Sequence, residues 1–175
     1  KDGYNLVLSH GNGPQVGNIL LRNDAGEEIY DIPQMPLDIC VADSQGGIGY
    51  MLEKMLRNIL KEEGIDREVV TIVTQVVVSK DDPAFKNYTK RVGKLYSKER
   101  ADEMAAKKGW VFKENSKNDD KWRRVVPSPE PKEIMNERII KDLVNAGVIV
   151  IASGGGGIPV YYDEKGMLQA FEAVI

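Results

Sequence analysis

Three short apolar runs alternate along the chain with segments whose apolar residues recur at helical spacing. The runs cover residues 4–8, 69–78 and 148–151. The middle run, VVTIVTQVVV, is rich in β-branched residues and has no regular alternation, which is typical of a parallel strand buried on both faces. Because helical segments separate these strands, the pattern predicts an α/β fold with a mainly parallel sheet.

The helical segments have recognisable starts and stops. Helices are predicted at residues 18–22, just after Pro14; at 37–63, between Pro36 and Gly64; at 98–108, between Ser97 and Gly109; and at 134–146, before Gly147. The polar stretch 23–34 is predicted to be a loop.

The longest predicted helix, 37–63, carries an apolar stripe in its second half. Such a stripe normally faces a core, so we expect a structural role for its members: Ile48, Met51, Leu52, Met55, Leu56 and Ile59. Three glycines interrupt the middle of the helix, Gly46, Gly47 and Gly49. They should either kink it or allow another backbone to pack closely.

Between residues 81 and 131 the regular alternation stops. Residues 110–113 and 122–126 are predicted to form an antiparallel pair joined by a polar turn at 114–121. We interpret this block as an excursion from the main sheet, a small protruding α+β subdomain that could serve as a flap. After it, residues 159–172 are predicted to form a hairpin around Gly166.

A glycine-rich turn at residues 9–17 joins the first strand to the following helix. Gly11 and Gly13 let the turn bend tightly, so that the backbone N–H groups of Gly11, Asn12 and Gly13 can face a ligand. The positive end of the helix dipole points to the same place, which favours an anion such as phosphate. The alternative is a tight turn without a ligand, since the spacing matches neither common phosphate-loop motif.

A second glycine cluster favours the ligand-binding alternative. Residues 153–157 read SGGGG and follow the last main strand. Consecutive glycines cost backbone entropy, so stability alone does not explain them. Loops at the carboxyl ends of parallel strands meet at one edge of the sheet, where α/β proteins bind ligands. Ser153, Gly154, Gly155 and Gly156 are therefore candidate phosphate-binding residues.

Composition narrows the classes of function. With 175 residues, 42% hydrophobic and 29% charged, the chain can bury one good core. A formal net charge of −3 argues against a nucleic-acid partner, and no apolar run is long enough to span a membrane. Cys40 and His10 are the only residues of their kinds, so we expect no disulfide, no metal site made by this chain, and a cytoplasmic location.

One basic cluster has two interpretations. Lys86, Lys90, Arg91 and Lys94 lie together in the excursion. An exposed basic run is usually a solvated surface, but an anion at the glycine loops would favour a role in binding it. His10 is more readily a packing residue than a base.

Together these motifs resemble the carbamate kinases, of the amino acid kinase superfamily, along nearly the whole chain. The residues that carry the resemblance are HGNGPQVG (10–17), MPLD (35–38), SQG (44–46), IGY (48–50), TQ (74–75), DPAF (82–85), TK (89–90), VVPSP (125–129) and ASGGGGIP (152–159).

The resemblance implies a three-layer sandwich in the N-terminal lobe of a two-lobed protein. Residues 1–175 would form this lobe, which binds carbamate or carbamoyl phosphate, with the subdomain at about 81–131 above the acceptor site. A C-terminal lobe, binding ADP or ATP with Mg²⁺, would follow Ile175, and a first strand would precede Lys1. Residues 1–175 alone are then expected to be inactive. Family members are typically cytosolic homodimers, here through the helix at about 37–63.

The implied reaction moves a phosphoryl group between carbamoyl phosphate and ADP, often as the last step of arginine fermentation. Lys90 would be catalytic and reach the transferred phosphate, while Gly11 and Asn12 contribute to the same anion site. Several positions depart from the family pattern: Tyr88 and Arg91 stand where prolines are common, Asp43 where methionine is common, and 115–121 replaces a shorter turn. The rival hypothesis is a non-catalytic, regulatory module that binds an anion or metabolite.

Overall fold

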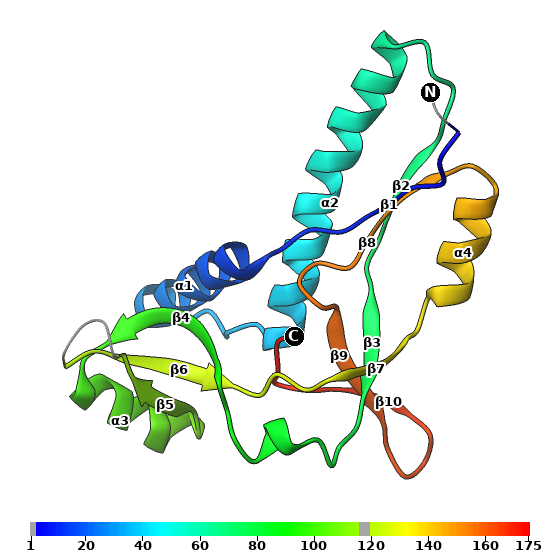
Figure 1. Cartoon of the computed structure of the whole chain (residues 1–175). Helices are drawn as coiled ribbons and strands as arrows, with labels where there is room; N and C mark the ends of the chain where they lie inside the picture. Colours follow the sequence, from blue (N-terminus) through cyan, green and yellow to red (C-terminus); the bar gives the residue numbers. More distant parts are fainter. Residues whose placement is uncertain (1–2, 116–119) are drawn as a thin grey trace.

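The computed structural model describes residues 3–115 and 120–175, and it contains a three-layer α/β sandwich (Figure 1). Three parallel strands lie in the order β1 (Val7–Leu8), β8 (Ile149–Ala152) and β2 (Val69–Ile72). Helix α2 (Leu37–Glu62) covers one face of these strands and α4 (Glu137–Asn145) the other. The predicted fold class is confirmed.

A second group of strands continues the sheet. β3 (Gln75–Val78) pairs in parallel with β9 (Ile158–Tyr162). Two antiparallel strands flank them, β7 (Pro131–Ile134) beside β3 and β10 (Leu168–Ala170) beside β9. The predicted hairpin at 159–172 is therefore confirmed as β9 and β10.

The prediction of one continuous strand over 69–78 was wrong, because the main chain leaves the ladder at Thr74. There the buried side chain of Gln45, from α2, forms hydrogen bonds with the backbone. Thr74 N donates to Gln45 Oε1 at 2.7 Å, and Gln45 Nε2 donates to Thr74 O at 3.2 Å. Thr74 O also accepts from Ile158 N, at the start of β9, at 2.9 Å, so both backbone groups of Thr74 are satisfied, as burial demands.

Residues 90–126 form the protruding subdomain, which extends from the sandwich beside α1 (Figure 1). Its antiparallel sheet has the order β4 (Lys90–Tyr96), β6 (Trp122–Val126) and β5 (Val111–Glu114), with α3 (Lys98–Lys108) packed on it. The predicted pair and the helix capped by Ser97 are confirmed, whereas β4 was missed. Part of the predicted turn at 114–121 lies outside the described residues.

A short connector leads from β3 to the subdomain. It contains a 3₁₀ turn at Pro83–Phe85, where Asp82 accepts from Ala84 N at 2.8 Å. The other Asp82 oxygen accepts from Glu130 N at 3.0 Å, and Glu130 lies in the connector that leads back from the subdomain to β7. These backbone hydrogen bonds lower the pKa of Asp82 and join the two connectors of the subdomain.

Two helix boundaries differ from prediction. α1 spans Gly13–Tyr30, so the loop predicted at 23–34 was wrong for residues 23–30 and is confirmed only for 31–34. The polar residues there pair with the subdomain, which makes a polar helix face stable although it has no core to cover. The helix predicted at 134–146 begins later, at Glu137, because Ile134 pairs with Val76 as the last residue of β7.

The apolar stripe of α2 divides between two environments. Leu52 and Leu56 pack on the core residues of β2 and β8, as expected. Met51, Met55 and Ile59 are about half exposed, at 54%, 55% and 48%, so their predicted core role was wrong. No helix in the described residues is both long and apolar enough to cross a membrane.

The three glycines of α2 do not kink the helix, which continues through them. Only Gly49 has a close neighbour: a Cβ there would lie 2.1 Å from Thr71 Cγ2. Close packing of α2 on β2 therefore requires glycine at this position. Gly46 and Gly47 face open space.

Cys40 is expected to be inert towards thiol reagents in the folded protein. The residue is completely buried, and burial raises the pKa of its thiol to about 11. At pH 8 roughly one molecule in a thousand would carry the reactive thiolate. Timed alkylation with iodoacetamide should therefore show almost no labelling of native protein and rapid labelling in urea. Equal labelling rates would show that Cys40 is accessible.

Candidate functional site

The two glycine loops meet at one edge of the sheet, as predicted. β1 and β8 are parallel neighbours with Leu8 opposite Ile151, so the loops that follow them start side by side. Gly155 N donates to His10 O at 2.9 Å and joins the loops directly. The sequence of strand, glycine loop and helix thus places both clusters in one small region.

Asn12 joins three segments with its side chain. It is 3% exposed, and its Nδ2 donates to Ser44 Oγ at 2.9 Å and to Gly154 O at 3.1 Å. Ser44 Oγ in turn donates to Val41 O at 2.6 Å. The side chain of Asn12 therefore holds the first loop against α2 and the second loop, a role that the local sequence did not reveal.

The start of α1 is left open by this arrangement. Asn12 is the N-cap residue, yet its side chain makes no hydrogen bond to its own helix. Asparagine usually caps the first N–H groups at this position. Within the described residues, the N–H groups of Gly11, Asn12 and Gly13 donate to no acceptor. Gly11 and Gly13 are also exposed, so these donors and the dipole of an 18-residue helix are available to an anion.

The second loop is held in place by close packing. Gly154, Gly155 and Gly157 have φ values of +152°, +64° and +96°, which favour glycine. A Cβ on Gly154 would lie 2.4 Å from Gln45 Cγ, and one on Gly156 would lie 2.1 Å from Ile175 Cγ2. These glycines therefore have a structural reason of their own, and their contact with a ligand remains a prediction.

Ser153 also turns inward. Its N–H donates to Thr74 Oγ1 at 2.7 Å and its hydroxyl donates to Gly155 O at 2.8 Å. The bend in the strand at Thr74 and the glycine loop are thus joined by hydrogen bonds. Gln45, Ser44 and Thr74 are supporting residues that the sequence reasoning missed, because only the folded chain brings them to the loops.

Lys90 stands at the first position of β4, opposite Val126, and its side chain is exposed. Further along the same strand, Lys94 and Tyr96 contact Asp24 of α1. α1 and β4 lie side by side and run in the same direction (Figure 1). A bulge between Val92 and Leu95 shortens β4, so Lys90 and Tyr96 stand opposite Val126 and Trp122, which are four residues apart on β6. Four strand residues span about 13 Å, equal to about nine helical residues. Lys90 therefore lies about level with Gln15, in the first turn of α1.

The predicted basic cluster divides into two parts. Lys94 pairs with Asp24 at 3.5 Å, and Arg91 donates to Glu114 O at 3.4 Å. Lys86 and Lys90 are exposed and have no partner among the described residues. Of these two unpaired cations, Lys90 is the one on the strand beside α1.

His10 packs between the loops. Its Nδ1 lies 3.1 Å from Gly11 O, and its Cε1 lies 3.2 Å from the position that a Cβ on Gly154 would take. Its Nε2 is buried and has no hydrogen-bond partner in the described part of the chain. Gly11 O can only accept, so this contact orients the ring with Nδ1 as the donor, and the burial of Nε2 agrees with a packing role.

A separate cavity of about 440 Å³ lies between the subdomain and the start of α2. None of the predicted site residues lines it. Inside it, Arg124 pairs with Glu172 at 2.7 Å and stacks over Trp110 at 4.0 Å from the ring centre. Glu172 also accepts from Leu37 N at 3.0 Å, which supplies the cap that α2 lacks. The cavity is thus lined by a structural ion pair.

Comparisons with known proteins agree on one family. No protein-family model matches the chain. It is 54% identical over 173 residues to a carbamate kinase of Pyrococcus horikoshii and 47% identical over 176 residues to one of Trichomonas vaginalis. These matches cover 99% and 100% of this chain, and 54% and 55% of the relatives.

Solved structures give the same result. A carbamate kinase from Giardia lamblia bound to AMP-PNP superposes with a TM-score of 0.88 at 44% identity, over 99% of this chain and 54% of that one. The chain thus spans about half the length of the relatives it matches. Over that half, both the sequence and the fold of this chain match those of carbamate kinases.

Proposed function

We propose that the protein carrying this chain transfers a phosphoryl group between carbamoyl phosphate and ADP, in the reaction ATP + carbamate ⇌ ADP + carbamoyl phosphate. Its similarity to carbamate kinases supports the reaction. One structural observation carries the site: the N-cap side chain of Asn12 turns away from α1 and leaves the first N–H groups of the helix open. Lys90 lies about level with them along α1.

Phosphoryl transfer requires alignment of donor and acceptor and neutralisation of the equatorial oxygens, with little covalent chemistry by the protein. The N–H groups of Gly11, Asn12 and Gly13 would hold the phosphate of carbamoyl phosphate. Lys90 would place one positive charge on the oxygens of the group in transfer. Ser153, Gly154, Gly155 and Gly156 would form the opposite wall of the site.

We propose ATP or ADP with Mg²⁺ as the second substrate. The described residues do not fit a resident metal site, because no three His, Cys, Asp or Glu side chains among them come together to hold an ion. In this proposal the metal arrives with the nucleotide. The Giardia relative bound to AMP-PNP supports the use of an adenine nucleotide by the family.

The alternative is a regulatory module of the same fold that binds an anion or metabolite without transfer. A coupled assay of ATP formation from ADP and carbamoyl phosphate, on the complete protein, separates the two. We expect ATP to appear in proportion to protein. Binding of carbamoyl phosphate without ATP formation would support the regulatory module instead. We place the enzyme in the cytoplasm, making ATP in arginine fermentation.

We also propose that the protein is a homodimer through the exposed outer face of α2. Tyr50, Met51, Met55 and Ile59 are all large apolar residues exposed on this helix. Such a face is covered most simply by a symmetry-related copy of itself. We therefore expect Met55→Glu to convert the dimer to a monomer, because it would place two like charges, one from each copy, in the interface around the two-fold axis.

Light scattering measures this change in mass. The matched control is Ile139→Glu, which makes the same kind of substitution at a residue of α4 that is 48% exposed. An unchanged mass for Met55→Glu would place the interface elsewhere. Gly49→Arg is a poor test, because its side chain would meet Thr71 within the same chain.

A further inference from the structure

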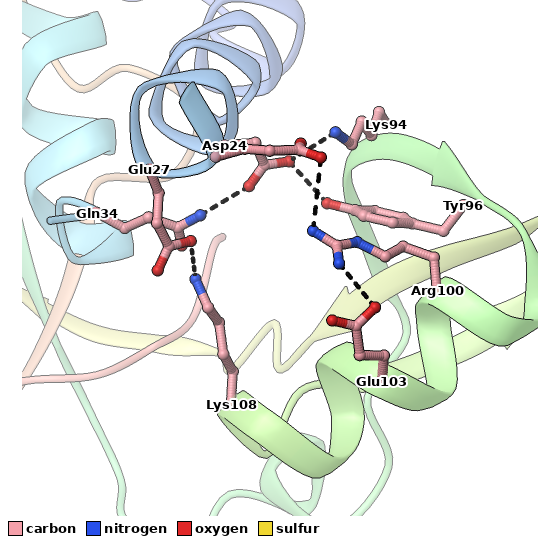
Figure 2. Close-up of polar contacts among 9 residues, drawn as sticks. Asp24, Glu27, Gln34, Lys94, Tyr96, Arg100, Glu103 and Lys108 are labelled. Carbon is pink, nitrogen blue, oxygen red and sulfur yellow. Dashed lines mark hydrogen bonds and ion pairs between the residues drawn. The ribbon is translucent and has the colours of Figure 1, made fainter. Parts of the chain in front are cut away.

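Three carboxylates on α1 face the subdomain. Glu27 and Glu28 lie three and four residues after Asp24, so the three share one side of the helix. Figure 2 shows Asp24 and Glu27 on this side. Each has a partner on the subdomain. These contacts explain why the polar second half of α1 is helical.

Asp24 is the carboxylate that contacts β4. Its Oδ2 accepts from Tyr96 Oη at 2.8 Å and lies 3.5 Å from Lys94 Nζ. Its Oδ1 accepts from Gln34 Nε2 at 2.8 Å (Figure 2). The Asp24 side chain is only 11% exposed. Burial, with the hydrogen bond to Asp24, raises the pKa of the Tyr96 hydroxyl, which therefore stays protonated and donates.

The other two carboxylates contact α3 instead. Glu27 pairs with Lys108, which lowers the pKa of Glu27, and Glu28 lies 4.0 Å from Arg100. Arg100 also pairs with Glu103 at 2.7 Å on its own helix (Figure 2). Among the three carboxylates of this face, Asp24 thus makes the polar contacts to the strand that carries Lys90.

The position of β4 along α1 decides where Lys90 lies. Both candidate groups stand at the same end of these two elements: the open N–H groups at the start of α1 and Lys90 at the start of β4. Val16 and Leu20 of α1 and Val92 of β4 belong to one apolar cluster, with Val126 of β6, which holds the two elements together. Apolar packing is not directional, so it tolerates sliding better than hydrogen bonds do.

We infer that Asp24 is a positioning residue: its bonds to Tyr96 and Lys94 fix β4 on α1 so that Lys90 reaches the phosphoryl group held at Gly11–Gly13. The inference rests on the proposed function. It assigns a role in phosphoryl transfer to a residue that lies, by the same helical rise, about 16 Å along α1 from Gly13. A displacement of about 1 Å at a reacting group can cost about 100-fold in rate, so a modest slide of β4 would be felt.

The test compares Asp24→Ala in two backgrounds. In the otherwise native protein we expect kcat for ATP formation to fall about ten-fold, with KM for ADP unchanged, because Lys90 is displaced. In a Lys90→Ala background the same substitution should have almost no further effect, since the group it positions is absent. Equal losses in both backgrounds would mean that Asp24 serves stability alone and would overturn the inference.

Matched variants guard against loss of folding. Glu28→Gln removes a carboxylate from the same helix face without touching β4, and we expect it to leave kcat unchanged. Tyr96→Phe removes only the hydroxyl that donates to Asp24, and we expect a two- to five-fold lower kcat that again depends on Lys90. If Tyr96→Phe is fully active and Asp24→Ala does not fold, the inference fails.

A second readout does not depend on activity. Spin labels at Asn18 on α1 and Arg91 on β4, both exposed positions, report the relative position of the two elements. We expect the distance distribution to broaden or shift in Asp24→Ala and to stay narrow in Glu28→Gln. An unchanged distribution in Asp24→Ala would overturn the inference. If the distance shifts in Asp24→Ala but the native protein forms no ATP, the proposed function and the role of Asp24 in transfer are both contradicted. Only the structural contact between Asp24 and β4 would then remain.

Discussion

Lys90→Ala is expected to lower kcat for ATP formation by about 10²- to 10³-fold while the melting temperature stays nearly unchanged. The rate falls because one positive charge is removed from the oxygens of the phosphoryl group, and loss of a comparable donor has this effect in other enzymes. Stability is retained because Lys90 is exposed and has no partner among the described residues. Steady-state kinetics and calorimetry on the complete protein measure the two quantities.

Lys86→Ala is the matched control, since Lys86 is also exposed and lies four residues before Lys90. It should leave kcat within about two-fold of native, as surface charges usually contribute little. Lys94 is a less suitable control, because it pairs with Asp24. Equal losses from Lys86→Ala and Lys90→Ala would mean that the arm only attracts substrate. If neither substitution lowers kcat, Lys90 is a solvated surface residue with no role in catalysis.

Asn12→Asp is expected to destabilise the fold by about 3 kcal/mol or more at pH 8, although the side chain keeps its shape. The native amide donates to Ser44 Oγ and Gly154 O. Ser44 has already given its own proton to Val41 O, and a carbonyl has none to give. A buried carboxylate would therefore face two acceptors without a proton between them, which is costly. Chemical denaturation measures the loss.

The loss should depend on pH. Burial beside two acceptors favours the protonated carboxyl, so the variant binds more protons folded than unfolded and its stability rises as pH falls. We expect the deficit relative to the native protein to be smaller at pH 5 than at pH 8. Asn18→Asp, at an exposed position on the same helix, controls for added charge. A pH-independent deficit, or none, would contradict the hydrogen-bonding role assigned to Asn12.

Most strands and helices could be predicted from the sequence where burial and caps coincide, but β4 and β7 were missed. α3 begins after Ser97 and ends at Gly109, and both signals are local. α1 was predicted too short because its second half has no core to face. Its stability comes from carboxylates such as Asp24 that pair with residues more than 70 positions later, and no local pattern reports such partners.

The outline of the site could also be predicted, but its internal support could not. The glycine spacing indicated that the loops would meet, and Gly155 N bonding to His10 O confirms it. Sequence reasoning assigned the backbone N–H of Asn12 to the ligand but missed the role of its side chain, which donates to Ser44 and Gly154. A side chain of this kind can bind an anion or satisfy buried polar groups. Its role can be assigned only when its neighbours in space are known.

The bond between Asn12 and Gly154 joins positions 142 residues apart. At a synthesis rate of about 5 to 20 residues per second, the second loop is made roughly 7 to 28 s after the first. Until then the first loop lacks its partner in the second loop, and contacts between distant residues form slowly. The proposed anion site is therefore among the last features to assemble, and we expect binding of phosphate to report a chain in which both loops have folded.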